Sequence, residues 1–239
     1  MINYDTFWKD NHCHNLHPSV RLRNDFIFSQ LKHRQFWTLL DVGCGDGYFV
    51  NLMYSQFPDK QLSGTDISEY IISKNSTDFP AISFFYSDLW DKDFSPPQTF
   101  DVVVCSEVIE HISDWKQVIQ NLAKFINEEG YCVLTTQSWK RYKSDLNIGH
   151  LKHFTLEELE DECKKYWLVP IVSYKKGFPF YNLQKWAYEK IENKAKDIQQ
   201  WEAWISTRLL FSFVYHLFCL SPKSRTLWPQ IFMVLQKNS

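Results

Sequence analysis

Short apolar runs alternate with longer amphipathic segments between positions 37 and 137. Each run is rich in β-branched and aromatic residues and lacks polar alternation, which is typical of strands that are covered on both faces of a sheet. We predict five such strands, at residues 37–42, 61–65, 82–86, 100–105 and 130–136. The segments between them predict helices at 48–57, 68–76 and 113–127. This alternation indicates βαβ units and therefore an α/β fold with a doubly wound parallel sheet.

The pattern changes after residue 137. Thr155 and Glu158 predict a capping box that opens a helix to about residue 166. We expect further strands at 168–174 and 228–236, with a long aromatic and helical stretch between them at 182–220. The apolar run within that stretch, 209–220, is shorter than the roughly 20 residues that span a bilayer. We therefore expect it to pack on the sheet or in a dimer, in preference to a membrane.

Three of the seven glycines, Gly43, Gly45 and Gly47, directly follow the first predicted strand. In a doubly wound sheet, ligands bind beyond the carboxyl ends of the strands, and glycines let the backbone approach a ligand closely. The GxGxG spacing differs from the GxGxxG fingerprint of dinucleotide-binding proteins. Asp41 and Asp46 flank the turn, and carboxylates repel a pyrophosphate. The turn therefore favours a ligand that carries positive charge, such as an amine or a sulfonium.

Two further acids end predicted strands. Asp66 stands at the end of the second strand and Asp88 after the third. An acid in the position of Asp66 can accept hydrogen bonds from both hydroxyls of a ribose. The site edge of the sheet therefore carries several carboxylates.

These motifs, in the order DVGCGDG, GTDIS, FYSDLW, FDVVVCSEVIEHI and NEEGYCVLTT, resemble those of class I S-adenosylmethionine (SAM)-dependent methyltransferases. The resemblance implies a Rossmann-like seven-stranded sheet with an antiparallel last strand, plus a helical insert near the carboxyl terminus. It implies SAM as the cofactor. The cofactor-binding residues that it implies are Asp41, Gly43, Gly45, Gly47, Asp66, Ile67, Asp88, Leu89 and Ser106.

The candidate chemistry lies in SEVIEHI, which supplies Glu107, Glu110 and His111. On a helix, these three residues share one face. His150 and His153 follow the fifth strand in a loop, and we expect both groups to converge on one pocket. We expect the two glutamates to raise the pKa of His111, because a nearby carboxylate favours the charged imidazole.

Three interpretations of the SEVIEHI group remain open. It contains a general base or substrate ligand, or structural residues only, or ligands of a divalent metal. The SEVIEHI group, followed by a distant histidine, resembles that of ubiquinone-pathway O-methyltransferases and small-RNA 3′-end methyltransferases. In those families such residues are associated with Mg²⁺. Metal-free relatives carry the same letters, so we expect no metal.

The chain divides into an expected helical arm or lid at residues 1–36 and a SAM-binding domain at 37–239, with the aromatic insert at about 178–226. His12, His14 and His17 are a weak candidate for zinc and better fit an arm that folds over the cofactor. Arg21 and Arg23 are expected either to clamp a carboxylate or to be solvated.

The charge and cysteine content of the chain argue against some classes of function. The formal net charge of −2 gives no general attraction to nucleic acid. The six cysteines form no disulfide framework, and no apolar signal-peptide core is visible, so we expect a cytoplasmic monomer or homodimer without a transmembrane segment.

The leading hypothesis is methyl transfer to an oxygen or nitrogen of a small molecule such as a sugar, quinone or secondary metabolite. The first alternative is a metal-assisted RNA-terminal 2′-O-methyltransferase, which needs a basic groove. Its candidate cations are Lys140, Arg141, Lys143, Lys152, Lys164 and Lys165. The second alternative is a non-catalytic binding protein with the same fold.

Overall fold

A computed structural model describes residues 4–6, 17–138, 140–191, 205–226 and 229–238. Its strands are β1 (Thr38–Val42), β2 (Gln61–Asp66), β3 (Ser83–Tyr86), β4 (Phe100–Ser106), β5 (Ile126–Gln137), β6 (Leu168–Lys176) and β7 (Gln230–Lys237). Its longer helices are α2 (Pro18–Leu31), α3 (Tyr48–Gln56), α4 (Glu69–Asp78), α5 (Trp115–Phe125), α7 (Leu156–Lys164), α8 (Phe180–Ile191) and α10 (Ile205–Leu220). Two short elements, η1 (Ile109–His111) and α6 (Lys143–Asn147), lie between them.

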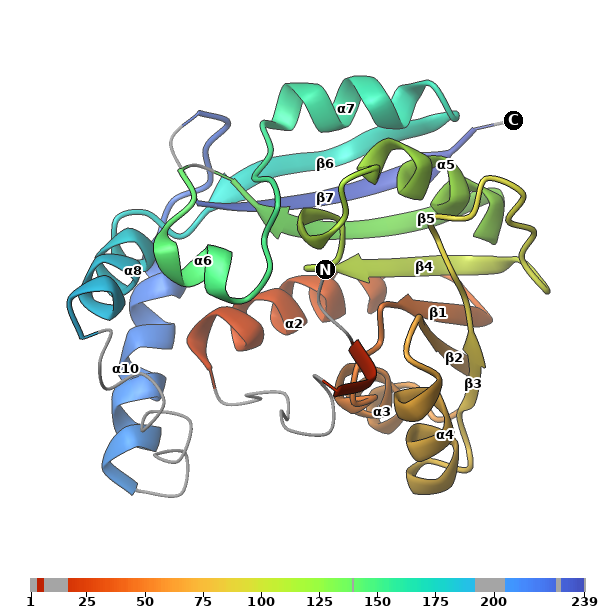
Figure 1. Cartoon of the computed structure of the whole chain (residues 1–239), viewed down its shortest axis with the longest axis horizontal. Helices are drawn as coiled ribbons and strands as arrows, with labels where there is room; N and C mark the ends of the chain where they lie inside the picture. Colours follow the sequence, from red (N-terminus) through yellow and green to blue (C-terminus); the bar gives the residue numbers. More distant parts are fainter. Residues whose placement is uncertain (1–3, 7–16, 139, 192–204, 227–228, 239) are drawn as a thin grey trace.

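The strands form one seven-stranded sheet in the order β3-β2-β1-β4-β5-β7-β6. β1 to β5 pair in parallel, whereas β7 is antiparallel to both β5 and β6 (Figure 1). The predicted fold class, including the antiparallel last strand, is therefore confirmed. The carboxyl ends of the parallel strands point toward the end of the molecule where α6 and α8 lie.

Side chains cap several of the helix starts. The side chains of Ser68 and Asp114 accept the backbone N–H groups of Ile71 and Gln117 at the starts of α4 and α5. Both halves of the predicted capping box between Thr155 and Glu158 are present at α7. These contacts satisfy N–H groups that a helix start leaves without a partner.

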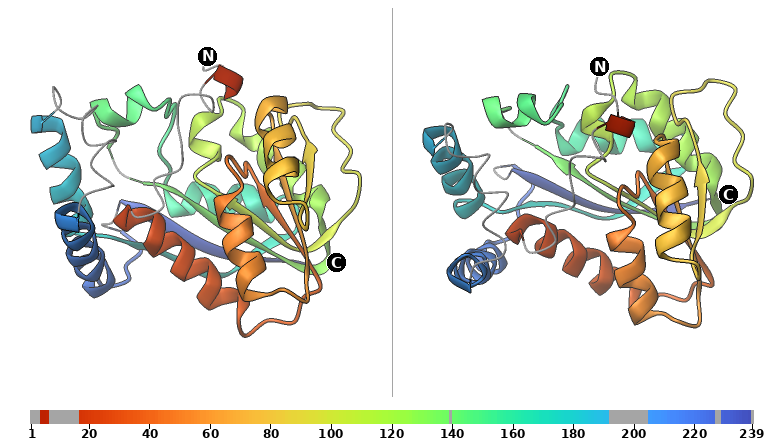
Figure 2. Two further views of the ribbon diagram at one scale, coloured as in Figure 1. Left: turned by 90° about the horizontal axis from the view of Figure 1, so that it is seen from below. Right: turned by 60° about the horizontal axis from the view of Figure 1, so that its bottom comes forward.

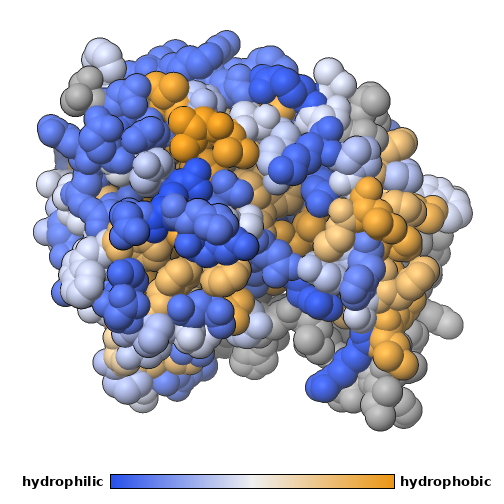
Figure 3. Space-filling view, turned by 180° about the vertical axis from the view of Figure 1, so that it is seen from behind, coloured by the Kyte–Doolittle hydropathy of each residue, from blue (hydrophilic) through white to orange (hydrophobic). Residues whose placement is uncertain are grey.

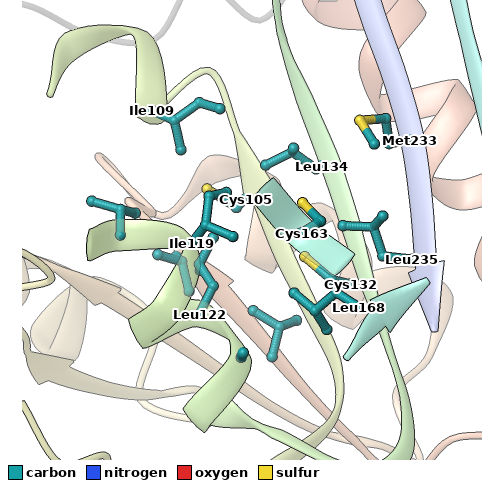
Figure 4. Packing of buried hydrophobic residues seen from close by; sticks show 14 of the residues in the cluster. Cys105, Ile109, Ile119, Leu122, Cys132, Leu134, Cys163, Leu168, Met233 and Leu235 are labelled. Carbon is teal, nitrogen blue, oxygen red and sulfur yellow. The ribbon is translucent and has the colours of Figure 1, made fainter. Parts of the chain in front are cut away.

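Two apolar clusters cover the two faces of the sheet, and Figure 2 shows the helices on either side. Residues of α5 and α7 build the first cluster with the strands, and Cys105, Cys132 and Cys163 lie within it (Figure 4). These cysteines are buried and free, as expected for reduced cysteines that pack like small apolar residues. The second cluster joins α2 and α3 to the opposite face.

Helix α2 belongs to the core of the domain, because Leu22, Phe26, Ile27 and Leu31 are buried against the sheet. The predicted arm at 1–36 therefore contains a helix that is part of the domain itself. His12 and His14 lie outside the described residues. Among the described residues, no helix is long and apolar enough to cross a membrane.

The first glycine of the turn gives a test of the fold. Gly43 has φ +70°, and a Cβ there would lie 2.5 Å from Cγ2 of Val108. We expect Gly43→Ala to lower the free energy of unfolding by about 1–3 kcal/mol, since left-handed backbone strains other residues by that amount. Urea unfolding followed by circular dichroism measures the change. The double variant Gly43→Ala/Val108→Ala removes the overlap and keeps the strain, so it should recover only part of the loss. A Gly43→Ala protein as stable as the wild type contradicts the expectation.

Candidate cofactor and acceptor site

The glycine turn is fixed to β2 and α4 by backbone and side-chain hydrogen bonds. The N–H groups of Gly43 and Cys44 donate to the Thr65 carbonyl at 2.8 and 3.0 Å. The Asn75 side chain donates to the Gly45 carbonyl at 2.7 Å. Gly43, Gly45 and Gly47 all have positive φ, which glycine adopts without strain. The turn is therefore held in one shape by residues outside it.

Asp66 holds this turn through its own carboxylate. Oδ2 accepts the Gly45 N–H at 3.1 Å, and Oδ1 accepts the Ser68 N–H at 3.0 Å. Burial raises the pKa of Asp66, while these hydrogen bonds act in the opposite direction. The predicted cofactor acid thus has a second role, because it connects the end of β2 to the glycine turn.

The surroundings of the turn are acidic and fit a cationic ligand. Asp41 is buried, and its pKa is raised well above the usual range by burial and then by Asp66 and Asp46. Gly47 caps α3 in a left-handed conformation and offers no side chain to the first N–H groups of the helix. A sulfonium with adjacent polar groups satisfies both features, since its charge suits the acids and helix N–H groups bind carboxylates.

The other predicted cofactor residues lie along the same edge. Asp88 follows β3 and accepts the Trp90 N–H at 2.8 Å, and Ser106 ends β4 with its hydroxyl 2.8 Å from that of Thr135. Ile67 follows Asp66 directly. The side chain of Leu89 is buried in the core, so only its backbone is available to a ligand.

The expectation of a helix that presents Glu107, Glu110 and His111 on one face is wrong. Only Ile109–His111 form a single 3₁₀ turn, and Glu107 precedes it with φ +58°. The backbone of Glu107 departs from the helical conformation because of a tertiary contact. Its N–H donates to the Thr135 carbonyl on β5 at 3.0 Å. The side chains of Glu107, Glu110 and His111 nevertheless lie near one another, although they do not share a helix face.

The carboxylate of Glu107 is held by side chains from two elements, one of which is held in turn by a third. Arg23 of α2 places Nη1 3.6 Å from its Oε2. Gln137 at the end of β5 donates to the same oxygen, and the Tyr181 hydroxyl of α8 donates to Gln137 at 3.0 Å. Of the two predicted alternatives for Arg23, the carboxylate contact is the observed one, and the carboxylate is the protein's own. Its other oxygen, Oε1, is buried without a hydrogen-bond partner among the described residues.

Glu110 is fully buried. Thr136 donates to its Oε2 at 2.8 Å, whereas Oε1 has no hydrogen-bond partner among the described residues. Burial, and then the charge of Glu107, raises the pKa of Glu110 well above its usual range. Its backbone carbonyl accepts the N–H groups of Leu151 and Lys152 at 2.7 and 3.2 Å. This carbonyl therefore brings the predicted histidine loop to the end of β4.

His111 and His150 meet edge to face, with 4.7 Å between ring centroids. Nδ1 of His111 is buried and has no hydrogen-bond partner among the described residues. The expected rise in the His111 pKa is wrong: burial lowers it, although Glu107 acts in the opposite direction. Burial, and then the neighbouring His111, His153, Lys185 and Arg23, lower the pKa of His150 to about 2. Both imidazoles are therefore neutral at neutral pH.

The histidine group continues into residues that the sequence did not single out. Nδ1 of His150 lies 3.0 Å from Nε2 of His153, which in turn lies 3.9 Å from the buried carboxylate of Asp145. Lys185 of α8 donates to Asp145. A small pocket at the ends of β5, α6 and α8 is lined by His153, Asp145 and Lys185, together with Gln137, Tyr142 and Tyr181.

Tyr4 is a further residue that sequence analysis missed. Burial raises its pKa to about 12, and Asp66 and Glu110 contribute in the same direction. Its phenol thus lies within the electrostatic reach of both the cofactor acid and the SEVIEHI group. Asp5 accepts the Ser68 hydroxyl at 2.5 Å and fixes this segment beside α4. No local motif marks either residue, because long-range packing positions them.

Taken together, the sheet order, the glycine turn and the buried acid–imidazole group define a Rossmann-like transferase that binds a nucleoside cofactor. A family model described as a methyltransferase domain matches residues 14–169. The chain belongs to this methyltransferase domain family. The predicted family, enzyme class and SAM cofactor are thereby confirmed at the level of the family.

Individual relatives are distant. The chain is 26% identical over 138 residues to a malonyl-[acyl-carrier protein] O-methyltransferase of Calditerrivibrio nitroreducens, a match that covers 56% of this chain and 53% of that protein. It is 26% identical over 145 residues to a ubiquinone biosynthesis O-methyltransferase of Rickettsia akari, covering 56% of each. The chain thus spans about half the length of the curated relatives it matches.

Solved structures show the same fold. The N-methyltransferase NodS of Bradyrhizobium japonicum, solved with S-adenosyl-L-homocysteine, superimposes with a TM-score of 0.62 at 15% identity, covering 100% of both chains. A likeness at this identity supports the fold and leaves the acceptor to be argued from the site.

The role of Asp66 can be tested by ligand binding. We expect Asp66→Ala to weaken SAM binding by about 1–3 kcal/mol, since it leaves hydroxyls without partners and releases Gly45. Isothermal titration calorimetry measures the affinity. Asp59→Ala, which removes an exposed carboxylate on the turn before β2, is the control and should bind as the wild type does. An unchanged affinity in Asp66→Ala contradicts this role.

Proposed function

We propose that the protein transfers the methyl group of SAM to a hydroxyl oxygen of a small-molecule acceptor. Two relatives are named O-methyltransferases, which favours oxygen over nitrogen. When bound, SAM supplies an electrophilic methyl group on a sulfonium, which is already a good leaving group. The protein then has to align the acceptor and accept its proton.

The observation that carries this proposal is the free acceptor atom on His111. Its pKa is lowered by burial, so the ring is neutral, and Nδ1 is buried without a hydrogen-bond partner among the described residues. A hydroxyl acceptor placed there donates its hydrogen bond to Nδ1 and loses that proton to the imidazole as the methyl–oxygen bond forms. Glu107 stabilises the imidazolium that results, because its charge favours the protonated ring.

Glu110 and His150 have supporting roles in this mechanism. Burial, and then the charge of Glu107, raises the pKa of Glu110, which favours the protonated acid as a hydrogen-bond donor in the site. His150 packs its ring against His111 and fixes the orientation of that imidazole. Arg23 and Gln137 position Glu107 in turn.

The charges around the site favour a small molecule over RNA. Lys152, Lys164 and Lys165, which an RNA-binding groove would use, pair with Glu158, Asp161 and Glu162 respectively. A phosphate backbone would meet these acids together with the lysines. A purely structural or binding role leaves unexplained why the buried polar atoms of Glu107, Glu110 and His111 lack partners.

We expect His111→Asn to lower kcat by about 10²–10⁴-fold with SAM affinity unchanged, because it removes the base and keeps the size. The wild-type kcat should be level through neutral pH. It should fall only as the pH drops below the lowered pKa of His111, where the ring becomes protonated. A radiolabelled SAM transfer assay over an acceptor panel measures both, with the exposed His33→Asn as control. A fully active His111→Asn enzyme contradicts the mechanism.

A divalent metal at the same site is the second candidate. Ligand atoms of Glu110, His111 and His150 lie within 4.8 Å of one another. The atoms of Glu107, Glu110 and His111 that lack partners are carboxylate oxygens and an imidazole nitrogen, a donor set that suits Mg²⁺ or Mn²⁺. Glu110, His111 and His150 would hold the ion, which would offset the charge of Glu110 and lower the pKa of an acceptor hydroxyl.

Glu110→Gln separates the two candidates, because glutamine copies the protonated acid and is a poor metal ligand. With a metal-free base we expect Glu110→Gln to keep activity within a few-fold. A metal site instead predicts that calorimetry detects Mn²⁺ binding to the wild type that Glu110→Gln abolishes. That binding should tighten as pH rises, since Glu110 has to lose its proton. EDTA should then abolish activity and Mg²⁺ restore it. The absence of Mn²⁺ binding to the wild type excludes the metal candidate.

A further inference from the structure

The end of the molecule that faces the acceptor site carries an unusual amount of exposed apolar surface. Six large apolar side chains of α8 and α10 are 55–75% exposed there, and we call them the apolar ridge: Leu183, Trp186, Leu209, Leu210, Phe213 and Leu220. Figure 3 shows apolar side chains along the surface formed by α10. Isolated exposed apolar residues are common, but a set of this kind on two neighbouring helices marks an interaction surface.

Helix α10 is apolar on two opposite sides. Phe211 and Phe218 point inward, where Phe211 meets His17 at the start of α2. With 3.6 residues per turn, Leu209, Phe213 and Leu220 fall on the side directly opposite that packed face. A helix whose outer side faced only water would be polar there. The sequence of α10 therefore indicates that its outer side also contacts an apolar environment.

Charge identifies that environment. From residue 203 to residue 239 the chain contains no Asp or Glu, whereas its net charge as a whole is −2. Arg208 lies directly before Leu209, and Lys223 follows the end of α10, both of them exposed. Arg225 is also exposed but pairs with Glu160, and Asp25 accepts the Tyr215 hydroxyl at the flank of the helix. A helix that carries apolar side chains and cations but no acid of its own fits an anionic lipid surface, where the side chains enter the acyl region and the cations meet headgroups.

The size and position of the ridge agree with this occupant. A helix of 16 residues is about 24 Å long, which is too short to span a bilayer upright and sufficient to lie in its interface. Trp186 is a side chain typical of the interface. α8 also carries Tyr181 and Lys185 into the small pocket beside His153. A bilayer on this side would therefore lie next to the pocket.

We propose that the apolar ridge of α8 and α10 docks the protein on the surface of an anionic lipid bilayer. The binding is peripheral and reversible, because a few leucine and aromatic side chains insert and no segment crosses. The binding depends both on insertion of the apolar side chains and on attraction of the cations to the anionic headgroups. Docking is independent of methyl transfer and requires neither SAM nor an acceptor.

The test is flotation of the full chain with mixed phosphatidylcholine–phosphatidylglycerol vesicles. We expect the wild type to float with these vesicles and to dissociate partly at high salt. Leu209→Gln/Phe213→Gln should weaken the partitioning about 100-fold, at roughly tenfold for each large apolar side chain. Arg208→Gln should weaken it less, and only for anionic vesicles. Thermal unfolding and SAM titration check that each variant is folded.

Trp167→Asn is the matched control. Trp167 is 66% exposed before β6, at the opposite end of the sheet, and its left-handed backbone tolerates asparagine. This variant should float like the wild type. The proposal is overturned if the wild type does not float, or if both variants float equally. It is also overturned if sedimentation equilibrium shows a dimer that Leu209→Gln/Phe213→Gln dissociates, because the ridge then binds a second copy of the chain.

Discussion

The central strands are buried on both faces of the sheet, and this burial determines where a polar site can form. Val102, Val103 and Val104 of β4 are completely buried, and so are Leu39 and Leu40 on β1 and Cys132 and Val133 on β5. Apolar side chains fill these stretches, so the polar chemistry gathers toward the ends of the strands. Ser106 and Glu107 at the end of β4 and Gln137 at the end of β5 meet there. The glycine turn after β1 completes the same edge.

The positions of the glycine turn and of the strand-end acids at this edge could be predicted from sequence, because the information for them is local. Gly43, Gly45 and Gly47 stand in one turn, and Asp66 and Asp88 follow strands that their own residues reveal. The acceptor half could not be predicted in detail. Glu107 leaves the helical pattern because its N–H pairs with Thr135, which is 28 residues away in sequence. Tyr4, Gln137 and Lys185 come from three distant segments, and only packing brings them together.

The pKa of His111 shows where a count of neighbouring charges misleads. Two glutamates beside an imidazole predict a raised pKa, and Glu107 does act in that direction. Burial has the larger effect, because a charged ring loses more hydration than one carboxylate returns. The same burial raises the pKa of Glu110 and so favours its neutral form. Polar atoms without partners, rather than net charge, mark this region as a place for a ligand.

The place of β7 in the sheet has a consequence for biosynthesis. β7 follows every other strand in the chain, yet it lies between β5 and β6 and joins them through antiparallel ladders. A nascent chain on the ribosome therefore exposes two unpaired strand edges until residues 230–237 emerge, and β6 has no partner in the sheet before then. Such edges are templates for intermolecular pairing. A stop codon shortly before residue 230 would thus remove one strand and produce a chain prone to aggregate.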